Sequence, residues 1–391
     1  MSPSQARIPR HKVLLFLLVG AVLLLWGILP VWAWEGSFFD FFEHITSARA
    51  AAMGGLHSAL ADDADTLFSN PAGLRSVDRQ ITVSEFMLSF YDSALAIAGE
   101  TFSGSGGSSE YRYGIYSLWG PIGFSYLNKG GGFGIFSSSN IIMRTWGPIP
   151  AANETLEQNL VLIAAKAFRI PFPERWQSTL DIGLSIVGFM TAKGGSDTDI
   201  RQVLQSSGSF MDLLTDSSSA ESAMGVGVEF GLLYSLKDWL AFGIAGRNLA
   251  LEQIRTYGSI QDVISGGLST ARYNFLPLYL SAGILFRPPL GRLEWFLSDL
   301  LIAADYHNIF DFLIYPDGAT NPLLHIAVGL EFKLLDIVSL RAGYYQCLPS
   351  FGLGLDLTLF TLDLAYFGRE VSKEPGENPI SCFTAGVKFS Y

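Results

Sequence analysis

The sequence predicts an all-β protein, a transmembrane antiparallel β-barrel of about 14 strands whose lumen holds a helical N-terminal segment. Three observations support this prediction. Many stretches alternate strictly between apolar and polar or small residues, as in residues 224–232 and 326–333. The only apolar run long enough to cross a bilayer as a helix lies near the N-terminus, at residues 13–29. The chain also ends in an alternating stretch that closes on the aromatic Tyr391.

The composition excludes several classes of protein. Lys and Arg total 25 against 36 Asp and Glu, a formal net charge of −11, so a polyanion such as DNA would be repelled. Charged residues make up 16% of the chain, against about 25% in ordinary globular domains, which excludes a disordered or coiled-coil chain. Two cysteines are too few for a disulfide framework or a cysteine-rich metal site. We therefore expect no nucleic-acid partner, no metal and no cofactor.

Residues 1–33 are expected to form a secretory signal peptide. Arg7, Arg10 and Lys12 precede the apolar run, and Ala33 follows it where a small residue precedes a cleavage site. An uncleaved membrane anchor is the alternative, because the run is just long enough to span a bilayer.

Residues 34–79 do not alternate and are expected to form a compact plug inside the lumen. The stretches 47–55 and 59–68 are rich in small, helix-favouring residues. They end at Asn70, which can cap a helix, and at Pro71, which suits its first position. A periplasmic linker or a small N-terminal domain is the alternative.

Residues 80–391 are expected to form the barrel. A soluble β-sandwich also alternates, but these strands exceed the ~5–6 residues of average soluble strands. Gly mixed with charged residues on the polar face suits a water-filled lumen, and closure leaves no unpaired edge in lipid. The strands are expected near residues 80–102, 111–128, 131–145, 155–169, 177–193, 222–235, 238–249, 274–286, 299–310, 322–333, 336–345, 350–357, 359–369 and 380–391.

The connections alternate between long and tight, which orients the barrel, because long loops of outer-membrane barrels face outward and short turns face the periplasm. Long loops are expected at residues 103–110, 146–154, 194–221, 250–273, 311–321 and 370–379. Tight turns are expected at residues 129–130, 236–237, 334–335 and 358.

The end of the chain resembles the C-terminal assembly signal of bacterial outer-membrane proteins. That signal runs polar-x-Gly-x-x-aromatic-x-aromatic, and Thr384, Gly386, Phe389 and Tyr391 match it at the correct distance from the carboxyl terminus. The resemblance implies the outer-membrane bilayer as surroundings and the barrel-assembly machinery as a partner.

The N-terminal segment resembles the hatch of the FadL-like long-chain fatty acid transporters, in the branch shared with PorV-type barrels. The resemblance rests on residues 50–55, 59–63 and 70–74, which read Ala-Ala-Ala-Met-Gly-Gly, Ala-Leu-Ala-Asp-Asp and Asn-Pro-Ala-Gly-Leu. It implies a fourteen-stranded barrel closed by a hatch, with gating at Asn70, Pro71, Ala72 and Gly73. It also implies a hydrophobic groove formed by the third and fourth outer loops, which are the two longest expected here.

Those two loops carry apolar residues at helical spacing, which predicts an outer groove for lipid-like ligands or, as the simpler alternative, a lid that packs on itself. The groove residues are Ile200, Val203, Leu204, Phe210, Met211, Leu214, Leu251, Ile254, Tyr257, Ile260 and Ile264.

No motif for catalysis is found, and we expect no enzyme. Asp305 and His307 share one face of a strand, but a structural network is the simpler interpretation. Other charged residues are expected to face the lumen by parity, and Lys333 or Arg341 could meet a carboxylate headgroup. The inward set is Glu229, Glu331, Lys333, Arg341, Asp356 and Asp363.

The sequence thus favours an outer-membrane channel for passive uptake of hydrophobic compounds, with long-chain fatty acids as the expected ligand. The alternative is a non-transporting PorV-type barrel that binds protein partners for export or surface attachment.

Overall fold

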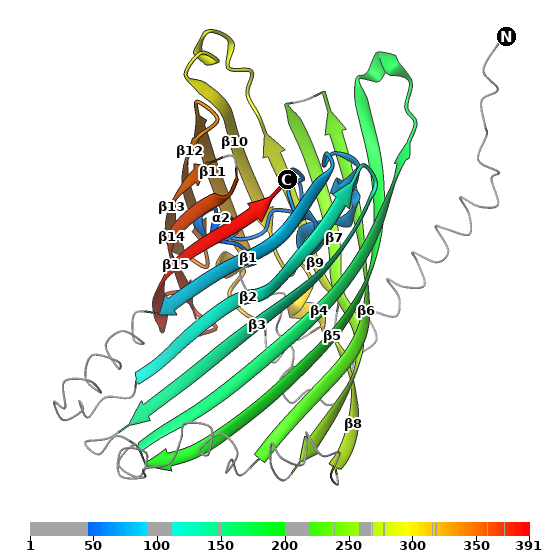
Figure 1. The fold of residues 1–391 in the computed structure, drawn as a ribbon. Helices are drawn as coiled ribbons and strands as arrows, with labels where there is room; N and C mark the ends of the chain where they lie inside the picture. Colours follow the sequence, from blue (N-terminus) through cyan, green and yellow to red (C-terminus); the bar gives the residue numbers. More distant parts are fainter. Residues whose placement is uncertain are drawn as a thin grey trace, which may run out of the picture.

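The computed structural model describes most of the chain beyond residue 45 (Figure 1). The described residues are 46–91, 112–146, 151–199, 219–237, 239–257, 267, 269–276, 278–314, 316, 319–357, 359–370 and 372–391. The expected signal peptide lies outside them.

Long alternating stretches form the strands, as the sequence predicts. The strands are β1 (Gln80–Tyr91), β2 (Arg112–Asn128), β3 (Gly131–Trp146), β4 (Ala151–Ile170), β5 (Ser178–Asp199), β6 (Ser219–Leu236), β7 (Leu240–Tyr257), β8 (Ser269–Leu276), β9 (Tyr279–Phe286), β10 (Leu297–Tyr306), β11 (Ile326–Leu334), β12 (Val338–Tyr345), β13 (Leu348–Asp356), β14 (Thr361–Glu370) and β15 (Pro379–Ser390). The helices are α2 (Ala48–Ala52), α3 (Thr66–Ser69) and α8 (Asp311–Ile314), with 3₁₀ turns η2 (Pro71–Arg75), η3 (Glu174–Trp176), η4 (Gly291–Leu293) and η5 (Pro322–His325).

Each strand pairs antiparallel with its neighbours, and the sheet closes on itself. Both β8 and β9 pair with β7, so in the described part of the chain fifteen strands occupy fourteen places around the barrel. β1 pairs with β15, and the backbones of Ile81 and Tyr391 exchange two hydrogen bonds of 2.8 Å. Pairing of the first strand with the last leaves no open edge at this seam. The predicted fourteen-strand barrel is therefore confirmed.

The outer surface of the barrel is apolar, as a membrane requires. Phe168, Ile186, Val226 and Phe351 are all more than half exposed, and they come from strands on different sides of the barrel. An apolar belt of this extent is stable only against hydrocarbon. The belt and the closed sheet together define a transmembrane β-barrel.

The two sides of the barrel differ in height. Strands β2 to β7 are 16 to 22 residues long, whereas β9 to β15 are 8 to 12 residues long. About 9–11 residues cross a bilayer. Figure 1 shows the long strands reaching beyond the others at the end opposite the C-terminus. We call this the long-loop end, and the end with residues 129–130, 237–239 and 335–337 the short-turn end.

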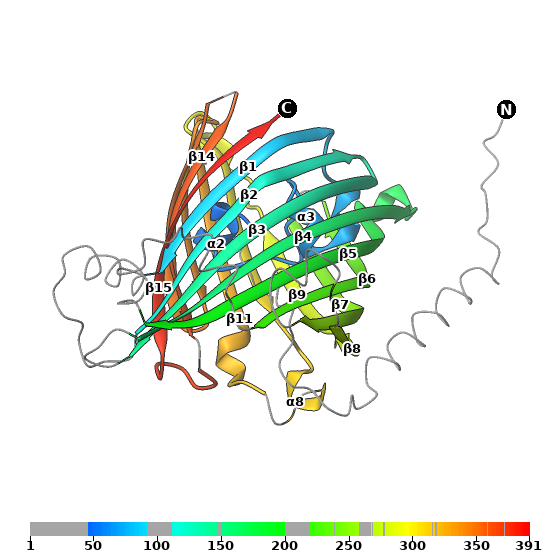
Figure 2. The same cartoon turned by 60° about the horizontal axis from the view of Figure 1, so that its bottom comes forward.

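Residues 46–79, here the N-terminal segment, lie inside the ring of strands (Figure 2). Its helices are only four or five residues long, and the rest is turn and extended chain. Ser47 caps α2 by accepting a hydrogen bond from the amide of Ala50 at 3.0 Å. The side chains of Leu67 and Leu74 are fully buried. The segment has little helix of its own, so the barrel wall must hold its shape.

Glycines on the inner wall make room for this segment. A Cβ atom at any of several strand glycines would collide with segment atoms, mostly backbone atoms. The expectation that these glycines line a water-filled lumen is therefore wrong at this level of the barrel, where they allow close packing. The glycines and the residues they face are Gly183 (Pro71 and Ala72), Gly231 (Asn70), Gly243 (Ser58), Gly329 (Met53 and His57), Gly343 (Met53 and Gly54) and Gly352 (Ala52).

Several strands extend further than the sequence predicted. β5 continues to Asp199 and β6 begins at Ser219, both within the range predicted for the third long loop, and residues 200–218 of that range lie outside the described residues. The helical pattern assigned to Leu251, Ile254 and Tyr257 is wrong, because these residues belong to β7 and pair with β6 and β8. A register shift lies opposite Asn248, whose φ is +62°, and strict alternation is lost there.

We predict that deletion of Phe389 to Tyr391 prevents assembly of the barrel, because it removes the last pairs of the closing β1–β15 ladder. The truncated protein should lose the heat-dependent shift in gel migration that folded barrels show. Deletion of residues 2–4, outside the barrel, is the control. A truncated protein that still migrates as a folded species would contradict the role of this terminus.

Gly183→Ala should displace the N-terminal segment without opening the barrel. The new methyl group would press on the backbone at Ala72, at a cost of about 1–3 kcal/mol. Hydrogen exchange of residues 57–76 should accelerate. Gly188→Ala on the same strand is the matched control, because its Cβ would meet no atom within 4 Å. Equal exchange in both variants would show that the glycine contact is dispensable.

Candidate functional site

Asn70 makes three hydrogen bonds, two within the N-terminal segment and one to the barrel wall. Its Oδ1 accepts from the amide of Ala72 at 3.0 Å, which caps η2 as predicted. Its Nδ2 donates to the carbonyl oxygens of Ser58 at 2.7 Å and Leu232 at 3.0 Å. The side chain is fully buried. Asn70 therefore connects two parts of the segment to β6, which a simple cap would not do.

His57 and Asp305 form a second buried junction. His57 Nδ1 lies 2.7 Å from Asp305 Oδ2, and His57 Nε2 lies 2.9 Å from the carbonyl oxygen of Met53. Asp305 also accepts from the amide of Ser58 at 2.7 Å. Both ring nitrogens of His57 therefore face oxygen atoms, one of a carboxylate and one of a backbone carbonyl. The geometry supports the structural interpretation of Asp305, with His57 as the partner in place of His307.

Arg49 holds the segment to β11 and β9 through shared carboxylates. It donates to Asp62 at 2.7 and 3.0 Å and to Glu331 at 2.8 and 2.9 Å. Asp62 also accepts from Arg287 at 2.8 Å. Glu331 accepts from Arg341 at 2.5 Å, and Arg341 donates to Asp363 as well. Removing one partner of a buried ion pair lowers the free energy of unfolding by about 3–5 kcal/mol. These contacts therefore help to hold the segment in its position against β11.

The pKa values of two buried carboxyl groups of the segment shift in opposite directions. Burial raises the pKa of Asp65 to about 6, and nearby Asp63 adds to the effect. Burial also disfavours ionised Asp62, but Arg49 and Arg287 outweigh it and hold the pKa of Asp62 well below its usual range. Asp62 is therefore the permanently charged anchor. Ionisation of Asp65 is less favourable in the ordered segment than in the unfolded chain. It therefore lowers the stability of the ordered segment above pH 6, and this loss of stability disappears as the pH falls from 6 towards 4.

A small cavity lies on the long-loop side of the segment, and we call it the outer cavity. Its volume is about 50 Å³, enough for a headgroup and too small for an alkyl chain. Its lining residues are Ala50, Ala51, Gly54, Gly55, Leu56, Arg247, Tyr279, His307, Tyr345, Leu348, Ser350, Phe367, Gly368 and Arg369.

Arg247 and His307 are the polar centre of the outer cavity. Both are nearly fully buried. Arg247 Nη1 donates to the carbonyl oxygen of Phe68 at 3.0 Å, and its guanidinium lies 5.0 Å from the centre of the Tyr279 ring. Arg247 Nε and His307 Nδ1 have no hydrogen-bond partner among the described residues. Burial, with Arg247 nearby, lowers the pKa of His307 to about 3, so its imidazole is neutral at pH 7. Two unpartnered nitrogens beside one fixed cation can bind an anion.

A second, larger cavity of about 830 Å³ lies on the short-turn side of the segment, and we call it the vestibule. Strands β4, β5, β6, β7 and β9 and their turns form its wall. Ala59, Ala61 and Ser76 of the segment contribute to its lining. No residue lines both cavities. The N-terminal segment therefore separates two compartments of one lumen.

The predicted site residues lie in different parts of the structure. Asn70, Pro71, Ala72 and Gly73 are buried between the segment and the wall. Arg341 is occupied by Glu331 and Asp363 and is not free for a headgroup, so that expectation is wrong. Lys333 lies near the short-turn end, 4.0 Å from Asp356. The predicted groove residues outside the described part of the chain are Ile200, Val203, Leu204, Phe210, Met211, Leu214, Ile260 and Ile264.

Arg247 and His57 were missed because the sequence does not show which charges meet inside the barrel. A single Arg within the apolar and small residues 240–251 was a usable signal, since such a charge must face the lumen. For His57 no signal existed, because its partner Asp305 lies 248 positions away.

These features define a transmembrane β-barrel of the outer-membrane type, with its own N-terminal segment lying across the lumen. In the described part of the chain, no helix has the length and apolar character needed to span a bilayer. No protein-family model and no curated protein matches the sequence.

Solved structures do match. A deltaS2 mutant of the TodX monoaromatic hydrocarbon channel is similar with a TM-score of 0.52 and 15% identity, over 90% of this chain and 99% of that one. The Ralstonia pickettii toluene transporter TbuX has a TM-score of 0.49 and 14% identity, over 90% and 99%. A Pseudomonas aeruginosa FadL homologue has 0.45 and 16%, over 88% and 98%. The FadL-type resemblance is thus confirmed as a likeness of fold.

We predict that Asn70→Ala loosens the segment while the barrel stays folded, because strand pairing does not involve this side chain. Loss of the cap costs about 0.5–2 kcal/mol, and the buried carbonyls of Ser58 and Leu232 lose their donor. Limited proteolysis within residues 57–76 should become faster.

Asn321→Ala is the matched control for Asn70→Ala. Asn321 also precedes a proline and caps a 3₁₀ turn, accepting from Leu323 at 3.0 Å, but at an exposed site. It should leave proteolysis of the segment unchanged. If both variants behave like the wild type, Asn70 is not needed to hold the segment.

Proposed function

We propose that this protein is an outer-membrane channel for passive uptake of hydrophobic molecules, with amphiphiles that carry one anionic head, such as long-chain fatty acids, as its ligands. The shared fold supports a channel, and the matched structures include proteins described as hydrocarbon and toluene channels. The outer cavity supports the anionic head. A neutral hydrocarbon would leave Arg247 Nε and His307 Nδ1 unsatisfied, whereas a carboxylate accepts from Arg247.

In this proposal the N-terminal segment acts as the hatch. The ligand head binds in the outer cavity against Ala50, Ala51 and Gly54, while its chain points towards the long-loop end. Passage to the vestibule requires the junctions at Asn70 and His57 to shift. Neither junction needs an energy source, because each consists of hydrogen bonds that can exchange with water or ligand.

The barrel wall offers a place for sideways release. Pairing between β1 and β2 is interrupted between Thr82 and Met87, and pairing between β2 and β3 between Trp119 and Gly123. Gly120, at φ +98°, lies within this interruption. Residues 130–132 are Gly-Gly-Gly, but Lys129 and Gly130 form the predicted tight turn there. We place the candidate exit in β2.

Arg247→Gln tests the ligand class. The affinity for a long-chain fatty acid should fall about tenfold, the loss expected for one buried charge-assisted hydrogen bond. The affinity for the fatty alcohol of equal chain length should change much less. The measurement is retention of each ligand by purified protein in mild detergent, followed by mass spectrometry.

Arg272→Gln is the control, since Arg272 is exposed on β8 and does not line the outer cavity. Misfolding would lower the retention of both ligands. The ratio of fatty-acid to fatty-alcohol retention therefore reports on headgroup binding and not on folding. An unchanged ratio in Arg247→Gln would exclude Arg247 as the headgroup site. Absence of any lipid-like ligand in the wild type would favour the partner-binding alternative.

A further inference from the structure

The vestibule has the size and lining of a binding site in its own right. Its volume of about 830 Å³ falls within the range of pockets that hold small molecules. Apolar side chains come from four places on its wall. They are the end of β4 with the residues that follow it, β6, the turn before β7, and β9, and the residues are Ile170, Phe172, Leu233, Trp239 and Leu285. An alkyl chain fits this volume, whereas the outer cavity has room only for a headgroup.

Three cations line the vestibule, and no carboxylate of the described chain does. Arg169 is held by Asp181, with both donor distances at 2.8 Å. Arg287 donates to Asp62 at 2.8 Å, and its Nε, which makes no hydrogen bond with a described residue, lies 3.8 Å from Oδ2 of Asp299. Lys237 is exposed in its turn and forms no ion pair with any described residue. The charged side chains that line this cavity are thus all positive, in a chain of net charge −11, and two of them are paired with carboxylates that do not line it.

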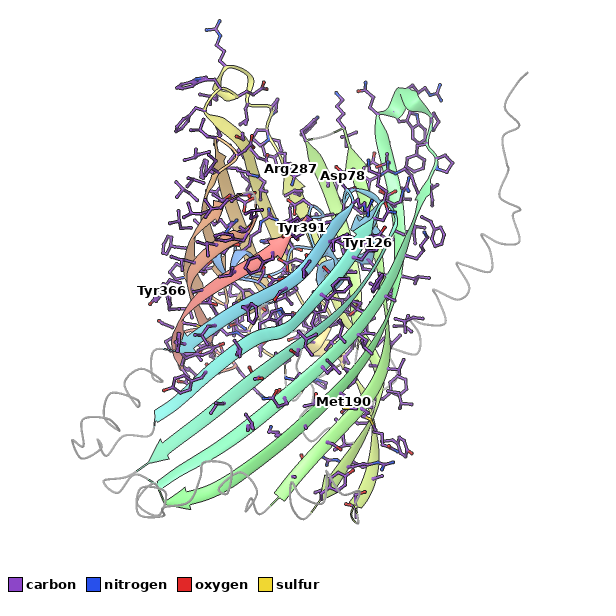
Figure 3. The ribbon with its side chains drawn as sticks, in the orientation of Figure 1. Asp78, Tyr126, Met190, Arg287, Tyr366 and Tyr391 are labelled. Carbon is purple, nitrogen blue, oxygen red and sulfur yellow. The ribbon has the colours of Figure 1, made fainter. Side chains whose placement is uncertain are left out.

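Arg287 connects the vestibule to the N-terminal segment. It follows β9, lies at the same end of the barrel as Asp78 and Tyr391 (Figure 3), and shares Asp62 with Arg49. An anion that approaches Arg287 from the vestibule competes with Asp62 for this guanidinium. Occupancy of the vestibule and attachment of the segment are therefore linked through one side chain.

We infer that the vestibule is a second binding site, on the short-turn side of the segment, for an amphiphile with a single anionic head, with the head at Lys237 and Arg287 and the chain along Phe172 and Trp239. The inference rests on the proposed function for its ligand class. The site itself stands on different residues and on the opposite side of the segment. Two sources supply this chemistry, a transported fatty acid and an acidic phospholipid.

Quenching of Trp239 by brominated amphiphiles tests the site directly. Bromine quenches indole fluorescence only at short range, and the difference between wild type and Trp239→Phe isolates this residue. A brominated fatty acid, a brominated phosphatidylglycerol and a brominated fatty alcohol are titrated separately into protein in nanodiscs. We expect saturable quenching of Trp239 by at least one anionic probe. Quenching by the fatty acid identifies a transported ligand, and quenching by the phospholipid alone identifies a membrane lipid.

Lys237→Asn tests the charge. Asparagine tolerates the left-handed backbone of residue 237, whose φ is +51°, so the turn is kept. The half-saturating concentration of the anionic probe should rise about two- to fivefold, as expected for one exposed charge. Lys129→Asn, which removes the same charge from another short turn outside the vestibule, should have no effect.

The results separate this inference from the proposed function. Quenching of Trp239 that persists in Arg247→Gln supports a site independent of the outer cavity. Absence of saturable quenching by either anionic probe overturns the inference, even if the outer cavity binds fatty acid. Equal quenching by the alcohol, or an equal effect of Lys237→Asn and Lys129→Asn, overturns the anionic preference.

Discussion

The contact between the N-terminal segment and the glycine-lined inner wall is the constraint on which the rest of the structure depends. Gly183, Gly243 and Gly343 allow strand and segment backbones to approach more closely than any side chain would permit. The segment has only short helices, so it could not keep this shape alone. Both cavities exist because the segment lies where it does, one on each side.

Polar contacts then determine how tightly the segment is held. Asn70 and the His57–Asp305 pair attach its centre to β6 and β10, while Arg49 attaches its start to β11. Asn70, His57 and Asp305 are buried and Arg49 is partly buried, and an unpaired partner in a buried position is costly. A moving segment must therefore exchange these partners for others, and water or a ligand head can supply them. The same network makes the closed arrangement specific and keeps its opening a discrete event.

The charged residues that line the lumen differ between its two cavities. The outer cavity offers one buried guanidinium whose Nε has no hydrogen-bond partner among the described residues, and the vestibule offers three cations around a large volume. In the proposed function, an anionic amphiphile that moves from the first to the second goes from a tight headgroup site to a wider one, and weaker binding there favours its release. Asp62, which faces Arg49 on one side and Arg287 on the other, lies between the two halves of this path.

The sequence by itself determined the barrel, because alternation at period two records which side of each strand faces lipid and needs no knowledge of distant residues. Fourteen strands, their closure at Tyr391 and the cap at Asn70 were all predictable on this local basis. The tertiary structure alone decided which inward residues meet. Gly183 faces Ala72, His57 faces Asp305 and Arg49 faces Glu331 across 111, 248 and 282 positions of sequence. Such pairs depend on the stagger of the closed sheet, which no local pattern encodes. For the same reason alternation alone misread Leu251 to Tyr257, and neither cavity could be located before the fold was known.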